Sequence, residues 1–461
     1  MRVLLINRND FIDGGADRVF LNTVELLQVA SCELQDATLA PSPATEGSAG
    51  ESLSRLVGRV GGEVHRDAGV GVGTFDVDTF TRRSANLDMA SDPRTLSVFG
   101  KLRLMGPYLY NRKVAKALDR KIRDFRPDVA HVHLIFGTLS ISVLKVLKQH
   151  RVPVVMTLHD YRLICPANAM LDRHGLVCER CKGGRYYNCL IHRCSGGNLF
   201  FSAIIMLESW MRKYLYIPLK LVDYFIFVSQ FALDKHLQSE PRYALKSSRL
   251  YNMTFPVPDQ PAHRGDYLLY FGRLSSEKGI LTLIEAANIT GLQLKIAGSG
   301  PQEVELERTI SERSESFTER SEVIREPQAN CSPSGSEVIL LGYRTGPDLE
   351  QLIRNCSFVV VPSVWYENNP MSVVEAFMHG KPVIGSRIGG IPELVTSETG
   401  FLFEPGNPDS LVGAIKKAVN LTDDEYISMS ENCRGFARKN FDRDRHLSQL
   451  TGIYQQLVNH A

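Results

Sequence analysis

The stretch VPSVWYENNPMSVVEAF, residues 361–377, carries the clearest structural signal in this chain of 461 residues. It follows an apolar run, residues 358–362, that is typical of a buried strand. Asn369 is a favoured residue at a helix N-cap, Pro370 suits the first helical position, and Gly380 predicts the helix end. Free N–H groups at the start of a helix that follows a parallel strand attract a phosphate. The stretch therefore predicts a strand, an anion-binding turn and a helix.

Short apolar runs separated by helix-length segments recur on both sides of this stretch. They predict strands at residues 3–7, 129–133, 154–159 and 225–229 in the first half, and at 267–271, 292–297, 338–341, 358–362 and 382–385 in the second. Continuous apolar strands of this kind form parallel sheets that are covered on both faces. The two sets predict two Rossmann-like, doubly wound α/β domains that face each other across a cleft.

The domain boundary is predicted at FPVPDQP, residues 255–261, because its three prolines exclude a helix. We expect an N-terminal domain over 1–255, a C-terminal domain over 256–440, and a final helix within 441–461 that packs back toward the N-terminal domain. Residues 41–49 are rich in small residues and residues 311–336 in Ser, Glu and Arg. Both segments are predicted to be exposed.

Composition excludes several classes of protein. With 43% hydrophobic and 23% charged residues the chain is neither fibrous nor disordered, and a formal charge of +2 gives no reason to expect a nucleic-acid partner. The chain begins directly with a strand pattern and contains no run of about 18 apolar residues, the length that a spanning helix needs. We predict a cytoplasmic location, with peripheral contact to the inner face of the cytoplasmic membrane.

Charged residues and glycines gather where the predicted strands end. Glu367 lies before the helix of residues 370–379 and Glu375 within it, while Arg273 and Lys278 follow the strand that ends at residue 271. A guanidinium and an ammonium at this edge of a sheet can bind phosphate oxygens. The alternative interpretation is that all four are ordinary surface charges. Glycine turns at residues 14–15, 298–300 and 389–390 follow strands in the same way.

These residues resemble the retaining nucleotide-sugar glycosyltransferases of the two-lobed GT-B type, particularly family 4. The resemblance covers nearly the whole chain, from Gly14-Gly15 through His159-Asp160 to Arg273, Lys278 and residues 399–407. Its most specific part is the block from Glu367 to Glu375 together with GGIPE at 389–393. It implies transfer of a hexosyl group, with retention of configuration, from a nucleotide-diphosphate sugar to a glycan or lipid-linked acceptor. The implied setting is exopolysaccharide, capsule or lipopolysaccharide synthesis.

The resemblance also implies individual roles. Glu375 would bind the ribose hydroxyls, Glu367 the transferred sugar, and His159 the sugar near the reacting centre. Arg273 and Lys278 would hold the diphosphate. The residues expected to act in catalysis are His159, Glu367, Arg273 and Lys278, and the donor-binding set is Gly14, Gly15, Gly272, Arg273, Lys278, Asn368, Asn369, Pro370, Met371 and Glu375.

No metal is obligatory for catalysis in that family. Breaking a sugar–diphosphate bond develops negative charge on the leaving group, which the two cations and the helix start would stabilise. Two Asp-x-Asp triplets, at residues 76–78 and 442–444, follow no convincing strand. We interpret both as surface charges rather than metal ligands.

Five of the nine cysteines fall within residues 165–194. The two-residue gap between Cys178 and Cys181 lets both sulfurs bind one ion, and with Cys189 and Cys194 they predict a structural zinc site. Cys165 and His192 are competing ligands. The alternatives are free thiols or a disulfide, and in each case the segment is expected to shape the acceptor pocket.

Two segments suggest contact with a lipid surface. Residues 101–126 hold nine Lys and Arg against two Asp, and residues 198–220 mix aromatic, aliphatic and basic side chains. Such amphipathic segments lie on anionic membranes. Core helices with a solvated basic edge would give the same pattern.

Two rival functions stay open. One is a catalytically silent binding or scaffold subunit of a polysaccharide-assembly complex, and the other is a two-lobed enzyme of different activity, such as a nucleotide-sugar epimerase or a sugar phosphorylase. No lysine site of the kind that carries pyridoxal in such a phosphorylase is evident, and the intact charged residues favour transfer over a silent subunit.

Overall fold

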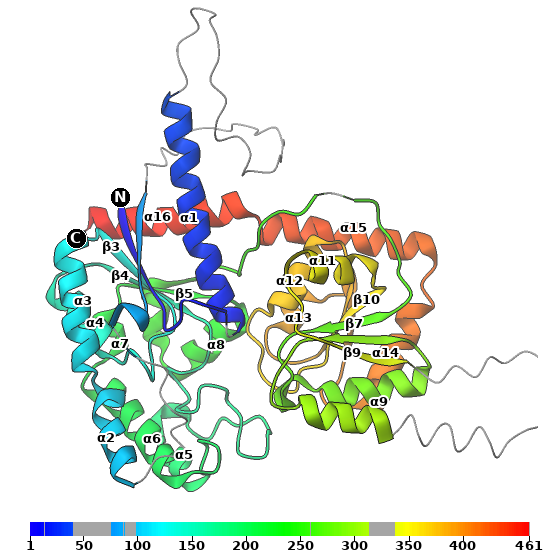
Figure 1. Ribbon diagram of the computed structural model, residues 1–461, viewed down its shortest axis with the longest axis horizontal. Coiled ribbons are helices and arrows are strands. Elements are labelled where there is room, and N and C mark those ends of the chain that lie inside the picture. The colour runs from blue at the N-terminus through cyan, green and yellow to red at the C-terminus, as the bar shows by residue number, and fades with distance from the viewer. Residues whose placement is uncertain are drawn as a thin grey trace, which may run out of the picture.

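The computed structural model describes residues 1–12, 14–39, 75–85, 87, 98–258, 260–312 and 337–460. Two six-stranded parallel sheets lie next to each other, each flanked by helices, and form an N-terminal and a C-terminal lobe (Figure 1). The predicted exposed segment at 41–49, and all but the first two residues of the one at 311–336, lie outside the described residues.

The N-terminal sheet has the strand order β2-β1-β3-β4-β5-β6. Its central strands are almost completely buried, as continuous apolar strands covered by helices must be. The order changes direction between β1 and β3, which is where ligands bind in open α/β sheets. The strands are β1 (Arg2–Ile6), β2 (Asp76–Phe80), β3 (Val129–Val132), β4 (Val154–Leu158), β5 (Tyr224–Phe227) and β6 (Ser247–Arg249).

The C-terminal sheet has the order β12-β11-β10-β7-β8-β9, the arrangement of a dinucleotide-binding fold. Its change of direction falls between β7 and β10, the strands that precede the predicted cations and the predicted glutamate loop. The strands are β7 (Leu268–Phe271), β8 (Leu294–Ala297), β9 (Val338–Gly342), β10 (Phe358–Val361), β11 (Val383–Ser386) and β12 (Gly400–Phe403).

Helices cover both sheets. Those of the N-terminal lobe are α1 (Gly15–Leu39), α2 (Val98–Leu109), α3 (Arg112–Phe125), α4 (Ser142–Gln149), α5 (Tyr187–Ile191), α6 (Leu199–Tyr214), α7 (Pro218–Leu221) and α8 (Gln230–Ser239). The helices that come after the interlobe connection are α9 (Ile280–Thr290), α11 (Gly346–Asn355), α12 (Met371–Met378), α13 (Ile391–Leu394), α14 (Pro408–Val419), α15 (Asp423–Asn440) and α16 (Arg443–Asn459).

The predicted fold class is confirmed, and all nine predicted strands are present with ends shifted by no more than two residues. Strands β2, β6 and β12 were not predicted; all three lie at the edges of their sheets, and β2 and β6 are polar. The Asp-x-Asp triplet at residues 76–78, which was predicted to follow no strand, itself forms the start of the edge strand β2, where Asp78 pairs with Lys121. Asp442 caps α16 by accepting from the Arg445 N–H.

The connection between the lobes runs from β6 to β7, and in its described residues it forms neither helix nor strand. At the other end of the chain, α15 lies along the C-terminal lobe and α16 crosses to the N-terminal one (Figure 1). Leu450 and Tyr454 of α16 pack with Val3 and Leu5 of β1. The last helix is therefore part of the N-terminal lobe's core.

Candidate functional site

The starts of α1 and α12 face each other where the two lobes meet. A Cβ atom placed on Gly15 would lie 3.7 Å from Cγ of Met371, and one on Gly14 would meet nothing within 4 Å. Both glycines are exposed. Two helix N-termini, one from each lobe, thus border one space, and each offers unpaired N–H groups to an anion.

Helix α12 begins one residue later than predicted. Pro370 occupies the N-cap position with extended backbone, and Met371 is the first helical residue. Asn369 does not cap the helix: its side-chain oxygen accepts from the Asn252 N–H and its carbonyl accepts from the Asn252 side chain, both at 2.9 Å. Asn252 lies in the interlobe connection, so these bonds join that connection to the loop before α12.

Glu367 is buried beside Lys278. The Lys278 ammonium donates to Glu367 Oε1 at 2.5 Å, and the Ser363 hydroxyl donates to the same oxygen at 2.7 Å. Burial disfavours the ionised carboxyl group, but the charge of Lys278 and the two hydrogen bonds outweigh it, so the pKa of Glu367 is lowered. The structure thus brings together two residues that are 89 positions apart in the sequence.

The backbone holds Lys278 and Glu367 close together because the segments that follow β7 and β10 contact each other. Gly279 adopts a φ of +68°, and a Cβ there would lie 2.1 Å from the Pro362 carbonyl oxygen, so only glycine fits. The Val364 N–H donates to the Glu277 carbonyl at 2.9 Å. These contacts hold Lys278 against the glutamate loop.

Glu375 makes its contact with the other lobe. Its carboxylate pairs with Arg18, one turn into α1 of the other lobe. Burial raises the pKa of Glu375, and the charge of Arg18 opposes that rise. The predicted ribose-binding carboxylate is therefore buried, and its cation comes from the opposite lobe.

Arg273 lies beyond the end of β7 and is exposed, as is Gly272. Its carbonyl accepts from the Tyr270 hydroxyl at 2.7 Å, which holds the turn. Its guanidinium makes no ion pair with any residue that the structure describes. A cation on a held turn at the switch point of the sheet is suited to an anionic ligand.

His159 lies at the end of β4 and contacts both lobes. Its Nε2 lies 2.9 Å from Nδ1 of His133, which follows β3, and its carbonyl accepts from the Asn368 side chain at 2.6 Å. Although the residue is partly exposed, burial of its ring lowers the pKa of His159 to about 4. The imidazole is therefore neutral at pH 7.

Gly389 and Gly390 support the glutamate loop instead of lining open space. A Cβ on Gly389 would lie 2.4 Å from the Glu367 carbonyl oxygen, and one on Gly390 would lie 1.9 Å from that of Asn368. Gly298 packs in the same way against the Gly272 carbonyl, at 1.9 Å. These glycines therefore let the loops pack closely against one another.

Glu393, in the same motif, joins the lobes. Its carboxylate accepts from the N–H groups of Gln230 and Phe231, the first residues of α8, and from the Tyr251 hydroxyl at 3.1 Å. A carboxylate at a helix N-terminus satisfies unpaired donors and interacts favourably with the helix dipole. The C-terminal lobe thus caps a helix of the N-terminal lobe.

Several buried polar atoms at this site lack a hydrogen-bond partner within the described residues. They include the ring Nε2 of His133, the side-chain oxygen of Asn368 and the side-chain nitrogen of Asn369. Such atoms are rare and costly in folded proteins, and a bound ligand is one way to satisfy them. Their concentration around the glutamate loop marks this region as the candidate functional site.

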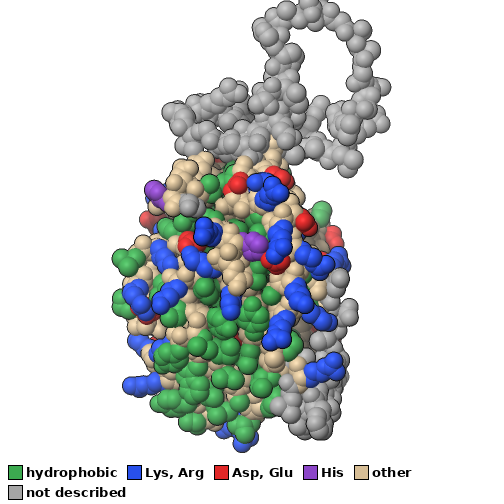
Figure 2. All heavy atoms as spheres, turned by 90° about the vertical axis from the view of Figure 1, so that its left-hand side faces the viewer, with side chains coloured by type: hydrophobic (Ala, Val, Ile, Leu, Met, Phe, Trp, Pro, Cys, Tyr) green, Lys and Arg blue, Asp and Glu red, His purple; other side chains and the backbone are tan. Residues whose placement is uncertain are grey.

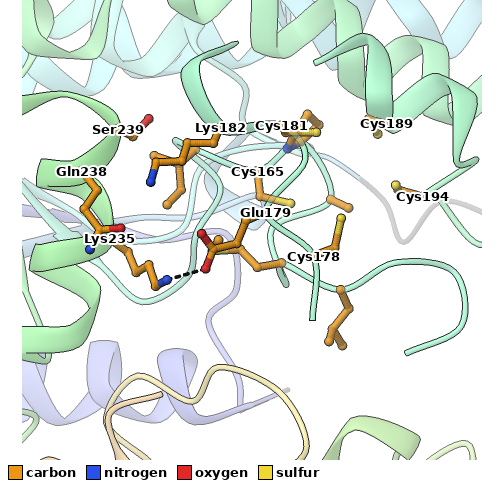
Figure 3. A pocket seen from close by; sticks show the side chains of 15 residues that line it. Cys165, Cys178, Glu179, Cys181, Lys182, Cys189, Cys194, Lys235, Gln238 and Ser239 are labelled. Carbon is orange, nitrogen blue, oxygen red and sulfur yellow. Dashed lines mark hydrogen bonds and ion pairs between the residues drawn. The ribbon is translucent and has the colours of Figure 1, made fainter. Parts of the chain in front are cut away.

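The five clustered cysteines line one pocket (Figure 3). Among the residues that the structure describes, no group of three or more His, Cys, Asp or Glu side chains is placed to hold a metal ion. The thiols of Cys178, Cys181, Cys189 and Cys194 therefore do not fit a zinc ion as they are placed, and a structural zinc stays a prediction.

Glu179, between the first two of these cysteines, ties their segment to the site. Its carboxylate pairs with Lys235 of α8 and accepts from the hydroxyl of Tyr366 at 2.9 Å. Tyr366 directly precedes Glu367. The cysteine segment is thus anchored next to the glutamate loop, and its role in shaping an acceptor pocket stays a prediction.

Both segments predicted to contact lipid are partly core. In the first, residues 101–126, Val114, Leu118 and Ile122 of α3 are buried. The second is residues 198–220. Ile204, Ile205 and Arg212 of α6 are buried, and Arg212 pairs with Glu208 at 2.6 Å. Figure 2 shows hydrophobic side chains gathered over the lower part of the N-terminal lobe's outer face, with Lys and Arg around them. Exposed residues of α5, α6 and the turn after α6 are Tyr187, Ile191, Leu199, Leu207, Lys213, Tyr214 and Leu215. No helix in the described part of the chain is long and apolar enough to cross a membrane.

Fold and site together define a two-lobed protein of the GT-B type. Residues 73–242 match the family model described as Glycosyltransferase Family 4, and residues 265–420 match the one described as Glycosyl transferases group 1. Each lobe thus matches a glycosyltransferase model, and the chain belongs to the glycosyltransferases.

Among curated proteins, the chain is 27% identical to an uncharacterised 42.6 kDa protein in the cps region of Klebsiella pneumoniae, over 62% of this chain and 64% of that protein. It is 33% identical to an Escherichia coli UDP-Gal:alpha-D-GlcNAc-diphosphoundecaprenol alpha-1,3-galactosyltransferase, over 26% of this chain and 30% of that one. The chain thus spans less than two thirds of the length of these relatives.

Among solved structures, Anabaena HepE in complex with UDP superposes with a TM-score of 0.60 at 17% identity, covering 99% of this chain and 100% of that one. Sucrose-phosphate synthase from Thermosynechococcus elongatus gives a TM-score of 0.60 at 18% identity over the full length of both chains. These likenesses show the fold.

Sequence reasoning missed three residues that the structure places at the site, Arg18, His133 and Asn252, and it gave no role to Glu393 of the GGIPE motif. Arg18 lies one turn after the glycine pair, and His133 ends a predicted strand next to the one that ends at His159. Both positions could have been found by comparing strand and helix ends. Nothing local signalled that Asn252 or Glu393 would bind the other lobe.

Proposed function

We propose that this protein is a retaining, family 4 hexosyltransferase that moves a sugar from a nucleotide-diphosphate donor to a glycan or lipid-linked acceptor. One observation carries the proposal: the Glu367–Lys278 and Glu375–Arg18 pairs lie at the two ends of the segment where α12 begins, opposite the start of α1. Both carboxylates are buried, so the structure commits charged groups to this site at a cost in desolvation.

The chemistry follows from charge. Cleavage of the sugar–diphosphate bond leaves a diphosphate, whose negative charge Arg273, Lys278 and the start of α12 would stabilise. Glu375 would accept hydrogen bonds from the ribose hydroxyls and Glu367 would orient the transferred sugar. His159, which is neutral, would contact the sugar without adding charge to it. In this scheme no metal is obligatory, because the protein's own cations neutralise the leaving group.

Comparison with relatives narrows the first donors to test. HepE has been solved in complex with UDP and with UDP-glucose, and the Escherichia coli relative is named for UDP-galactose and a diphosphoundecaprenol acceptor. A Salmonella typhimurium relative, 31% identical over 36% of this chain, is a lipopolysaccharide N-acetylglucosaminetransferase. These names support a UDP-hexose donor and a role in surface-polysaccharide synthesis.

The experiment is incubation of the purified chain with UDP-glucose, UDP-galactose and their N-acetylated forms, scored for donor-dependent release of UDP. We expect one donor to be used in preference to the others, and the released sugar or product to keep the donor's anomeric configuration by NMR. Absence of nucleotide binding and release with every donor would favour a silent scaffold subunit. Conversion of one nucleotide sugar into another without release would favour an epimerase.

We also propose peripheral contact between the α5–α6 surface and an anionic membrane. Exposed apolar side chains with Lys213 beside them support it, since apolar burial and attraction to anionic lipid add. Leu215→Ser is expected to reduce binding to phosphatidylglycerol vesicles, whereas Leu245→Ser, which changes an exposed leucine on a different element, is expected not to. Equal binding of both variants in a flotation assay would contradict the proposal.

A further inference from the structure

The ring of His133 is enclosed between the N-terminal sheet and α1. It lies nearly parallel to the His159 ring, at an interplanar angle of 16° and a centroid distance of 5.1 Å. Its centroid is 4.4 Å from that of the His131 ring and 5.4 Å from that of the Phe20 ring, which it meets in an edge-on arrangement. Only 3% of the residue is exposed. No role was predicted for His133. Among the described residues, however, it makes the only hydrogen bond to the His159 side chain.

His131 does not compete for that bond. Its two ring nitrogens pair with the hydroxyls of Tyr454 and Thr157, at 2.6 and 2.7 Å. The Nδ1 atom of His133 therefore pairs with Nε2 of His159 at 2.9 Å, and the Nε2 atom of His133 is buried without a partner among the described residues.

Two arrangements of protons satisfy the bond between the neutral rings. Either His133 donates from Nδ1, which leaves a bare lone pair on its buried Nε2, or His159 donates from Nε2, which leaves a buried N–H on His133. Burial lowers the pKa of both rings, so the doubly protonated form is not a competitor at pH 7. An orphaned buried N–H is the rarer and costlier defect, because buried donors are almost always paired.

We propose that His133 is a positioning residue that donates from Nδ1 to His159 and so fixes His159 with its proton on Nδ1. The Nε2 atom of His159 then serves as the acceptor, and the Nδ1–H group is left to donate. No other residue in the described part of the chain takes the Nδ1 atom of His159. The tautomer of one ring is thus set by the bond that its other nitrogen makes.

If the proposed function holds, the consequence concerns the donor sugar. A neutral N–H can donate to a sugar hydroxyl or to the leaving oxygen without placing a positive charge next to a carbon that itself becomes positive. With the opposite tautomer, His159 would present only an acceptor. The bond from the Asn368 side chain to the His159 carbonyl holds the backbone, so the ring orientation depends on His133.

The test reads the tautomer directly. Long-range ¹H–¹⁵N NMR spectra of the full chain labelled with ¹⁵N-histidine distinguish protonated from bare ring nitrogens, and His159→Gln identifies the His159 signal by its loss. We expect the wild-type protein at pH 7 to show His159 protonated on Nδ1 and bare on Nε2. A His159 ring with its proton on Nε2 would overturn the proposal. The measurement needs neither donor nor acceptor, so its failure is distinct from failure of the proposed transferase function.

Two variants separate positioning from packing. His133→Phe keeps a ring in place but cannot donate, and His133→Gln keeps an N–H donor without the ring. We expect His133→Phe to move the His159 proton toward Nε2 and to lower kcat by about 10-fold or more with little change in KM, the range for residues that orient an active ligand. His133→Gln should restore the Nδ1 tautomer and part of kcat. Equal loss in both variants with an unchanged His159 spectrum would contradict the proposal.

Discussion

The two lobes differ in the chemistry that they bring to the candidate site where they meet. The C-terminal lobe contributes charged groups, since Glu367, Lys278, Arg273 and Glu375 all lie at the ends of β7 and β10 or in α12. The N-terminal lobe contributes His159 and His133, which burial keeps neutral, and a glycine turn without side chains. Arg18 is the exception, and it is neutralised by Glu375 of the other lobe.

This difference in charge between the lobes fits the two parts of a nucleotide-sugar donor, which need different surroundings. A diphosphate is a dianion or more and needs cations, whereas the sugar is neutral and becomes positive as its bond to the leaving group breaks. Fixed cations belong on the leaving-group side and neutral donors on the sugar side. We therefore expect acid to destabilise the N-terminal lobe first. We expect removal of a charged side chain to impair the C-terminal lobe first.

The largest expected effect is acid destabilisation of the N-terminal lobe. Burial lowers the pKa of His131 to about 3 and of His159, His236 and His446 to about 4, from an ordinary value of 6.5. Between pH 6.5 and 4 the unfolded chain binds protons at these rings and the folded chain does not, so the free energy of unfolding falls as pH falls, by roughly 3 kcal/mol per ring over the window. Hydrogen exchange at pH 7 and pH 5 should show β3, β4 and β5 losing protection before β10 and β11.

A matched variant sharpens this prediction. His236 lies in the N-terminal core outside the cleft, where its ring stacks on Tyr161. His236→Phe should remove one ring's share of the pH dependence while leaving UDP binding unchanged. Equal acid sensitivity of the two sheets would break the comparison between the lobes.

The next largest effect is expected at Lys278. Lys278→Ala removes a cation from the proposed diphosphate site and leaves the buried Glu367 carboxylate without its ion-pair partner, so UDP affinity should fall by about 1–3 kcal/mol. Calorimetric titration with UDP measures it. Lys416→Ala changes an exposed lysine on α14 of the same lobe and is the control. Wild-type UDP affinity in Lys278→Ala would remove Lys278 from the donor site.

Much of this arrangement was predictable, because both sheets have buried strands whose apolar runs stand out from their surroundings. The residues at strand ends followed, since parallel strands present their carboxyl ends at one edge. β2 was missed because DVDTF is an edge strand with only its last residue buried. The contacts between lobes were not predictable: the partners Arg18 and Glu375 are 357 residues apart, and no local pattern sets their distance.

Asn369 illustrates a different limit. Its residue type and position fit a helix cap, and the prediction was wrong because the Asn252 backbone offered its side chain a buried partner. Tertiary contact overrode local propensity. The same holds for Gly389 and Gly390, whose role is to let backbone approach backbone at Glu367 and Asn368.

A smaller effect is expected from Arg18→Ala. Without the guanidinium, nothing opposes the rise that burial causes in the pKa of Glu375, so the carboxyl group takes up a proton more readily. A protonated carboxyl group is a poorer acceptor for ribose hydroxyls. UDP affinity of the variant should therefore fall by about fivefold, or roughly 1 kcal/mol, from pH 8 to pH 6, beyond any change in the wild type. An identical pH dependence in both proteins would show that Glu375 does not bind the ribose.

The smallest effect is expected at Glu393, a charged residue of the C-terminal lobe that contacts the start of α8 in the N-terminal lobe. Glu393→Gln keeps one acceptor oxygen for the N–H groups of Gln230 and Phe231 but loses the charge that interacts with the α8 dipole, a change of about 0.5–1 kcal/mol. The effect is local, so amide exchange at Gln230 and Phe231 should become about two- to fivefold faster while the melting temperature hardly changes. Glu398→Gln, at an exposed glutamate five residues further on, is the control. If both variants exchange alike, the cap is incidental to closure, and other contacts between the lobes, such as Arg18–Glu375 and Asn368–His159, hold them together.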